Sequence, residues 1–128
     1  MRFMMFMLPN IEDDERYMPT ADEVATMTAY NDEITKAGVM LTGEGLHPQT
    51  EGVRLAFSGG KSTVIDGPFT EAKEAIGGYW IIQTKTKDEA VEWAKRVPTV
   101  GGDFTIELRQ IFEMDEFPED VQAAAGHQ

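Results

Sequence analysis

The fold is decided by residues 2–8, which read Arg2-Phe3-Met4-Met5-Phe6-Met7-Leu8. Side chains of an extended strand alternate between its two faces, so Phe3, Met5 and Met7 share one face. The other face carries Met4, Phe6 and Leu8, and both faces are therefore apolar. A second segment, Tyr79-Trp80-Ile81-Ile82, also has large apolar groups on both faces. We expect both segments to be strands of a sheet that is covered on both sides.

Two capping boxes predict two helices. In Thr20-Ala21-Asp22-Glu23 the hydroxyl of Thr20 can accept a hydrogen bond from the amide of Glu23, which starts a helix at about residues 21–37. Gly38 follows where a left-handed terminating residue is expected. A second capping box, Thr86-Lys87-Asp88-Glu89, opens a helix that ends before Pro98.

Shorter apolar runs supply the remaining strands. Residues 39–41 form one, and the segment Gly43-Glu44-Gly45-Leu46-His47-Pro48 is expected to break regular structure after it. Residues 53–57 and 62–65 flank Ser58-Gly59-Gly60-Lys61 and predict a hairpin. Residues 70–74 predict a short helical turn capped by Thr70, and residues 104–109 predict the last strand.

The order strand, helix, strand, hairpin, strand, helix, strand predicts an α+β sandwich with two helices on one face of an antiparallel sheet. Two helices can cover only one face of this sheet, yet the strands at residues 3–8 and 79–82 are apolar on both. The open face needs a second layer, most simply a second copy of the chain. We therefore predict a homodimer.

Composition limits the classes of protein that remain. The chain has 128 residues, 41% of them hydrophobic, which suffices for one domain at residues 1–112 followed by a loose acidic tail at residues 113–128. The absence of cysteine excludes a disulfide scaffold, a thiol nucleophile and a thiolate zinc site, and it fits a cytoplasmic protein. The apolar start at residues 1–8 is too short to span a membrane and lacks the cleavage region of an export signal.

The charge is concentrated at the two ends of the chain. The net charge of -12 comes from 23 acidic and 11 basic residues, a balance that repels phosphate backbones and excludes nucleic acid as a natural partner. Residues 1–33 carry 8 acids and 2 bases, and residues 113–128 carry 5 acids and no base. The intervening residues 34–112 are nearly neutral, with 10 acids and 9 bases.

Five segments carry a resemblance to a known family: Gly43-Glu44-Gly45-Leu46, Val64-Ile65-Asp66-Gly67-Pro68-Phe69-Thr70-Glu71-Ala72-Lys73-Glu74, Gly77-Gly78-Tyr79, Ala90-Val91-Glu92-Trp93-Ala94 and Gly101-Gly102. The chain resembles the DGPF-domain proteins of the YCII-related family, from the first strand to about Arg109. The resemblance implies a ferredoxin-like subunit that pairs into a dimeric α/β barrel, in agreement with the strands that are apolar on both faces. Related barrels include cofactor-independent monooxygenases, and some relatives are linked to extracytoplasmic-function sigma factors.

The resemblance does not bring the wider family's chemistry with it. In YCII proteins a histidine on the first helix and a nearby aspartate have been suggested as an active-site pair. That histidine falls at about Met27 in this chain, so the acid-base pair is missing here. The part that carries over is the block Asp66-Gly67-Pro68-Phe69.

Asp66 and His47 are the candidate catalytic residues. A carboxylate at the end of a strand, held by a Gly-Pro turn beside Phe69, could be partly desolvated and act as a base. The alternative is that Asp66 only opens the turn by accepting hydrogen bonds from backbone amides. His47 could act as a base near neutral pH, or it could be an exposed loop residue.

Four further residues are candidates for ligand binding. Glu44 could face a cavity or pair with Lys73, and Lys73 could hold an anionic group. Of Tyr79 and Trp80 one must face the helices and the other the open face, where an aromatic wall would suit a flat organic ligand. Phe69 is the fourth candidate, beside Glu44, Lys73 and Tyr79. With two histidines and no cysteine, we expect no metal site and no cofactor.

Two functions from different classes fit these features. The first is a homodimer that binds a small apolar or aromatic molecule, and that could be a cofactor-independent enzyme using Asp66 and His47. The second is an interaction module that regulates a sigma factor or another partner through its acidic ends. The affinity of such a module would fall as salt screens the exposed charges.

Overall fold

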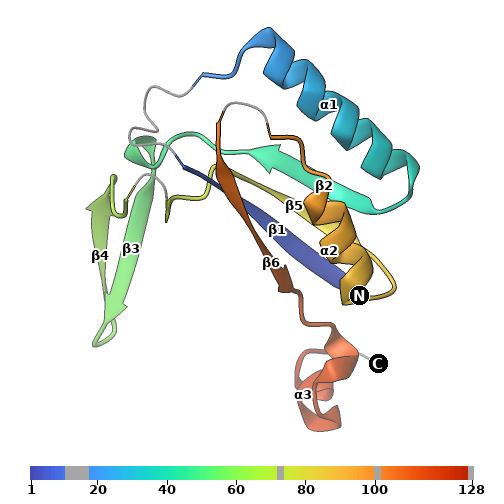
Figure 1. The fold of residues 1–128 in the computed structure, drawn as a ribbon. Helices are drawn as coiled ribbons and strands as arrows, with labels where there is room; N and C mark the ends of the chain where they lie inside the picture. Colours follow the sequence, from blue (N-terminus) through green and yellow to red (C-terminus); the bar gives the residue numbers. More distant parts are fainter. Residues whose placement is uncertain (11–17, 72–73, 100–101, 127–128) are drawn as a thin grey trace.

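A computed structural model of the chain describes residues 1–10, 18–71, 74–99 and 102–126. Four antiparallel strands form the main sheet in the order β2-β5-β1-β6, with β1 at Arg2–Pro9, β2 at Met40–Gly45, β5 at Gly78–Gln83 and β6 at Phe104–Gln110. Two helices, α1 (Ala21–Lys36) and α2 (Lys87–Lys95), lie on one side of this sheet (Figure 1). The predicted α+β fold of the ferredoxin-like type is confirmed.

The capping residues begin both helices as the sequence predicts. The Thr20 hydroxyl accepts a hydrogen bond from the Glu23 amide at 3.2 Å, and the Thr86 hydroxyl accepts one from the Glu89 amide at 3.1 Å. After α1 the chain turns at Gly38, whose φ of 74° is in the left-handed region that glycine adopts most easily.

The core lies between the helices and one face of the sheet. Phe3 and Met5 of β1 and Trp80 and Ile82 of β5 point toward the helices, and each is at most 5% exposed. They pack against residues from the helices and the segment after α2: Tyr30, Ile34, Ala90 and Val97. Alternation places Met4, Phe6, Leu8, Tyr79 and Ile81 on the opposite face, which neither α1 nor α2 covers (Figure 1). We call this surface the open face.

The predicted hairpin is confirmed and forms a sheet of its own. Strands β3 (Val53–Ser58) and β4 (Lys61–Asp66) pair only with each other, and they turn at Gly59 and Gly60, whose φ values of 57° and 78° suit a tight hairpin turn. Every residue of both strands is exposed. Figure 1 shows this hairpin projecting away from the main sheet.

The break in regular structure expected over residues 43–48 comes only after Gly45, because β2 continues to that residue. The glycine at position 43 serves side-chain packing and not a turn. A Cβ atom at position 43 would lie 2.8 Å from Cδ1 of Trp80, so only glycine lets the indole lie against the strand. Gly43 pairs with Trp80 in the sheet register, which places the two residues on the same face.

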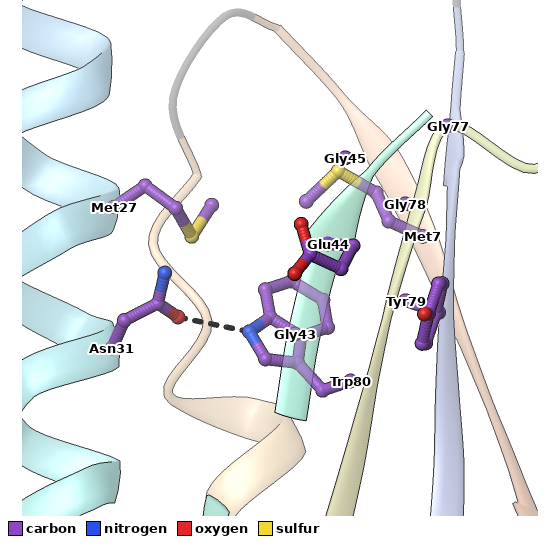
Figure 2. A pocket seen from close by; sticks show the side chains of 10 residues that line it. All are labelled: Met7, Met27, Asn31, Gly43, Glu44, Gly45, Gly77, Gly78, Tyr79 and Trp80. Carbon is purple, nitrogen blue, oxygen red and sulfur yellow. Dashed lines mark hydrogen bonds between the residues drawn. The ribbon is translucent and has the colours of Figure 1, made fainter. Parts of the chain in front are cut away.

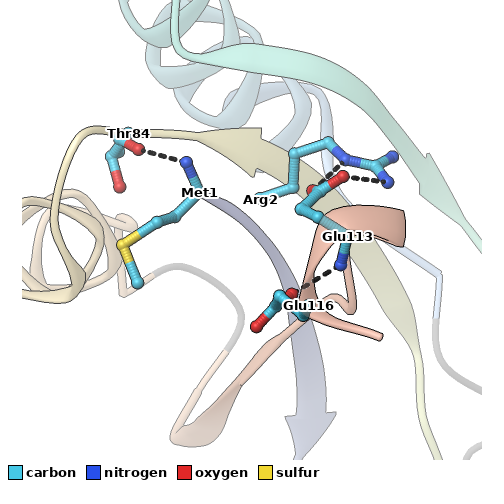
Figure 3. A network of polar contacts seen from close by, with 5 residues as sticks. All are labelled: Met1, Arg2, Thr84, Glu113 and Glu116. Carbon is cyan, nitrogen blue, oxygen red and sulfur yellow. Dashed lines mark hydrogen bonds and ion pairs between the residues drawn. The ribbon is translucent and has the colours of Figure 1, made fainter. Parts of the chain in front are cut away.

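The C-terminal segment, expected to be loose, contains a 3₁₀ turn η4 (Met114–Glu116) and a short helix α3 (Glu119–Ala124). Glu113 accepts hydrogen bonds from the Arg2 guanidinium at 2.7 and 3.2 Å, which ties this segment to β1 (Figure 3). The hydrogen bond from Arg2 lowers the pKa of the Glu113 carboxyl. The expected helical turn at residues 70–74 falls partly on residues 72–73, outside the described residues. None of the described helices is long and apolar enough to cross a membrane.

Candidate functional site

A pocket opens between α1 and the adjoining ends of β2 and β5, and we call it the α1 pocket (Figure 2). Its volume is about 160 Å³. The residues that line it are Met7, Met27, Asn31, Gly43, Glu44, Gly45, Gly77, Gly78, Tyr79 and Trp80. The lining thus combines two thioethers, an indole, a phenol, a carboxylate and one amide with four glycines.

The four glycines leave this part of the pocket lining without side chains. A Cβ atom at Gly78 would lie 3.1 Å from the Glu44 carbonyl oxygen, so β2 and β5 approach closely there. A Cβ atom at Gly45, by contrast, would meet no other atom within 4 Å. Gly45 is therefore a position where a larger side chain could fill the pocket without disturbing the backbone.

The polar centre of the α1 pocket is the pair of Asn31 and Trp80. The indole Nε1 of Trp80 donates a hydrogen bond to Oδ1 of Asn31 at 2.9 Å. Because the indole nitrogen can only donate, this bond fixes the orientation of the amide. The Asn31 amide nitrogen consequently points away from the indole and offers donors toward the side of Met27 (Figure 2).

Tyr30 holds the indole from the other side. Its ring meets the Trp80 ring edge to face at a centroid distance of 6.1 Å, and its hydroxyl donates to the Trp93 carbonyl oxygen at 2.9 Å. Burial raises the pKa of the Tyr30 hydroxyl to about 12, so the ring stays uncharged at any physiological pH. Trp80 therefore has little freedom to move away from Asn31.

A second pocket of about 400 Å³ lies at the base of the hairpin, and we call it the hairpin-base pocket. The Gln49 side chain organises it, because its Oε1 accepts hydrogen bonds from the amides of Phe69 and Thr70 at 3.0 and 3.1 Å. Its Nε2 donates to the Thr70 carbonyl oxygen at 2.7 Å. A Cβ atom at Gly67 would overlap the Gln49 carbonyl oxygen. The Arg54 guanidinium lies 4.2 Å above the Phe69 ring.

These contacts give the block at residues 66–69 a packing role. Gly67 allows the close approach to Gln49, and Phe69 fills the space beneath Arg54. Asp66 is exposed at the end of β4, so the apolar enclosure expected around its carboxylate is not formed. Asp66 is also not among the residues that line either pocket.

The other candidate residues fall into two groups. His47 and Phe69 line the hairpin-base pocket, where the exposed His47 Nδ1 lies 3.3 Å from the Glu51 carboxylate. Glu44 and Tyr79 line the α1 pocket, although the Tyr79 ring points away from α1 (Figure 2). Lys73 lies outside the described residues. The structure therefore does not gather the candidates into a single site.

Two residues with organising roles were missed by sequence reasoning. Asn31 is a polar residue on the helix stripe that otherwise carries Met27 and Ile34, and this mismatch was the available signal. Gln49 carries no such signal, because its partners lie 20 and 21 residues away in the chain. Among the described residues, no group of three or more His, Cys, Asp or Glu side chains could hold a metal ion.

Comparison with known proteins places the chain in a family. Its sequence is 28% identical over 110 residues to an uncharacterised protein of Rhizobium meliloti (strain 1021), with 84% of both chains covered. A solved structure with a TM-score of 0.42 and 16% identity is the 5-chloro-2-hydroxyhydroquinone dehydrochlorinase of Burkholderia phenoliruptrix AC1100 in complex with 2,5-dihydroxybenzoquinone, which matches over 90% of this chain and 98% of its own. The family model of the YCII-related domain matches residues 1–115, and the chain therefore belongs to the YCII-related family.

Proposed function

We propose that the chain binds a small molecule with a single hydroxylated aromatic ring in the α1 pocket. The observation that carries this proposal is the bond between Asn31 and Trp80, which presents an aromatic surface and a fixed amide donor side by side. Ligand pockets commonly combine apolar walls with a few polar groups that set the orientation of the ligand.

The size of the pocket supports a ligand of one ring. An apolar protein cavity of about 150 Å³ accepts benzene, and the α1 pocket has a volume of about 160 Å³. Met7 and Met27 border it, and their flexible thioethers make favourable contacts with aromatic rings. A larger ligand would have to extend past the ends of β2 and β5 into solvent.

The polar groups support a hydroxyl substituent. The Asn31 amide nitrogen can donate a hydrogen bond, and the exposed carboxylate of Glu44 can accept one. A phenolic hydroxyl both accepts and donates, so it suits this pair better than a carboxylate or an amine does. The Glu44 carboxylate would repel an anionic ligand. An aliphatic alcohol is a weaker hydrogen-bond donor than a phenol and would displace water from this carboxylate less readily.

Binding is supported better than catalysis. The position at which the family resemblance places a histidine is Met27, which lines the pocket and cannot transfer a proton. A proton-transfer step would rest on Glu44 as the acceptor of a phenolic proton, in the role first considered for Asp66 and His47. Since Asp66 and His47 do not line the α1 pocket, we assign neither of them a part in binding there.

We also propose that the functional unit is a homodimer in which two open faces pack together, as in a dimeric α/β barrel. Met4, Phe6 and Ile81 lie on the open face, and a second sheet about 10 Å away would remove them from water. Tyr79 also lies on that face and borders the α1 pocket. The dimer would therefore cover the ends of β2 and β5 beside the ligand.

Tryptophan fluorescence can test ligand binding, using catechol as the probe and cyclohexanol as a control that has a hydroxyl but no aromatic ring. The Trp93→Phe background leaves Trp80 as the only indole, and it keeps the Trp93 backbone carbonyl that Tyr30 binds. We expect saturable quenching by catechol and much weaker binding of cyclohexanol.

Substitutions at Gly45 locate the binding site. Gly45→Leu fills the pocket without a backbone clash and should weaken catechol binding at least about tenfold, whereas Gly45→Ala should retain most of the affinity. Unchanged binding in Gly45→Leu would move the ligand elsewhere. Absence of catechol binding in the parent protein would rule out the proposed ligand class.

A further inference from the structure

The β3–β4 hairpin exposes an apolar side that the subunit does not cover. Its strand register places Val53, Leu55, Phe57 and Val64 on one side, where they are 52, 53, 77 and 62% exposed. A two-stranded ribbon is marginally stable in water by itself, and contiguous apolar surface of this kind marks a contact site. This side of the hairpin therefore requires a partner.

The position and length of the hairpin identify where that partner lies. Figure 1 shows α1 and α2 on one side of the main sheet and the hairpin directed to the other side. Each hairpin strand has 6 residues and so extends about 20 Å. Packed sheets lie about 10 Å apart, so the hairpin is long enough to pass alongside a second sheet stacked on the open face.

The subunit exposes more surface than a compact monomer of its mass. The accessible surface of the subunit is 9025 Å², whereas a compact monomer of 14.3 kDa exposes about 6,800 Å². The open face alone, with four strands about 4.8 Å apart and about 20 Å long, presents roughly 400 Å². A stable interface buries about 800 Å² on each partner, so the open face needs an additional contact surface.

Charge favours a second copy of this chain as the partner. Residues 53–66 contain Arg54, Lys61 and Asp66 and carry a net charge of +1. Since the whole chain carries -12, the remainder carries -13. Arg54 and Lys61 lie on the side of the hairpin opposite the apolar side, where they can face the acidic body of a second copy once the apolar side is packed.

We propose that the β3–β4 hairpin is a dimerisation arm whose apolar side packs against a second copy of the chain, beside the paired open faces. The inference rests on the homodimer of the proposed function and extends it. Two-fold symmetry makes the contact occur twice, because each copy supplies one arm and receives the other. The arm thereby supplies the contact area that the open face lacks.

Sedimentation equilibrium of matched arm variants tests the inference. The double variant Leu55→Thr with Val64→Thr removes apolar groups from the buried side and keeps β-branched residues in the strands. It should weaken dimerisation at least about 100-fold, because four apolar side chains are lost per dimer. Ile65→Thr removes a comparable group from the other side of the hairpin and should leave the dimer nearly unchanged. All three positions are exposed in the subunit, so circular dichroism should show an intact fold.

Thiol reactivity provides a second, independent measurement, since the chain contains no cysteine. Val64→Cys and Thr63→Cys place single thiols at neighbouring positions on opposite sides of the arm. In the dimer the thiol at position 64 should react with a maleimide at least about tenfold more slowly than the thiol at position 63, and dilution to monomer should equalise the two rates.

The outcomes separate the arm from the dimer itself. If the parent protein and the double variant dimerise equally well, the arm is ruled out and the homodimer stands. Equal thiol reaction rates at positions 63 and 64 at all protein concentrations lead to the same conclusion. A parent protein that remains at 14.3 kDa at high concentration would overturn both. Loss of dimerisation in the double variant but not in Ile65→Thr establishes the arm.

Discussion

Three contacts meet at Trp80. Its indole lies against Gly43, donates to Asn31 and touches the edge of the Tyr30 ring. Together the three contacts hold the indole between β2 and α1. A ligand in the α1 pocket would therefore meet an indole that is already in place, which limits the entropy lost on binding.

The contact with Gly43 gives a prediction for a single added methyl group. Gly43→Ala brings its Cβ atom to 2.8 Å from Trp80 Cδ1, so the indole must shift, and we expect a loss of about 1–3 kcal/mol in the free energy of unfolding. Gly45→Ala adds the same methyl group where no atom lies within 4 Å and should be neutral or slightly stabilising. Urea denaturation measures both. Equal stabilities for the two variants would show that Trp80 can move freely.

Individual residues differ in how far the sequence predicts them. The caps at Thr20 and Thr86 were predicted because a capping box involves residues only three positions apart. Strand alternation required Tyr79 and Trp80 to face opposite sides, and the structure places Trp80 in the core. The pairing of Asn31 with Trp80 spans 49 residues and depends on where α1 lies along the sheet, which no local pattern specifies.

Among the elements, the C-terminal segment shows most clearly how a few contacts replace a core. Neither η4 nor α3 contains a buried side chain. The segment is held instead by the stacked rings of Phe112 and Phe117, whose centroids are 5.1 Å apart, and by the bond between Glu113 and Arg2. The acidic composition predicted an unstructured tail. The outcome differs because the Arg2 guanidinium emerges from the central strand beside this segment (Figure 3).

The ion pair of Arg2 and Glu113 predicts an acid-dependent loosening of this segment. The pKa of Glu113 is lowered from its ordinary value of 4.5 in the folded chain, so its contribution is fully present above that value. The contribution is lost as the pH falls through the lowered folded-state pKa. Both groups are partly exposed, so the effect on global stability should be small.

Hydrogen exchange of the α3 amides measures this local effect. Glu113→Gln should lower the protection factors of these amides at neutral pH to the values that the parent protein reaches only in acid. Asp32→Asn removes the same charge from an exposed position of α1 and should leave the protection factors of α3 unchanged at neutral pH. Similar exchange in both variants would mean that Arg2 does not hold the segment.

The hairpin and the block at residues 66–69 show that local sequence patterns predict an element but not its contacts with distant segments. The two strands and their Gly59-Gly60 turn were predicted, because alternation and turn glycines are local signals. The block was recognised as a motif, but the reason for Gly67 was not, since the Gln49 backbone that approaches it comes from a separate segment. A motif can thus mark a packing site as easily as a catalytic one.

For the whole molecule, the open face predicts the effect of one buried charge. In the proposed dimer Ile81 would lie between two apolar sheets, where an unpaired carboxylate is strongly disfavoured. Ile81→Asp should therefore convert the dimer to a monomer of 14.3 kDa in sedimentation equilibrium. Thr28→Asp adds the same charge to an exposed position of α1 and should leave the dimer intact. A dimer that persists in Ile81→Asp would place the interface elsewhere.

The position of β1 in the sheet has a consequence for synthesis on the ribosome. β1 is central, and both of its neighbours, β5 and β6, are encoded after residue 77. At a translation rate of about 5–20 residues per second, a strand that is apolar on both faces waits several seconds for its first partner. We therefore expect β1 to stay without its sheet partners in the nascent chain until β5 and then β6 have been synthesised.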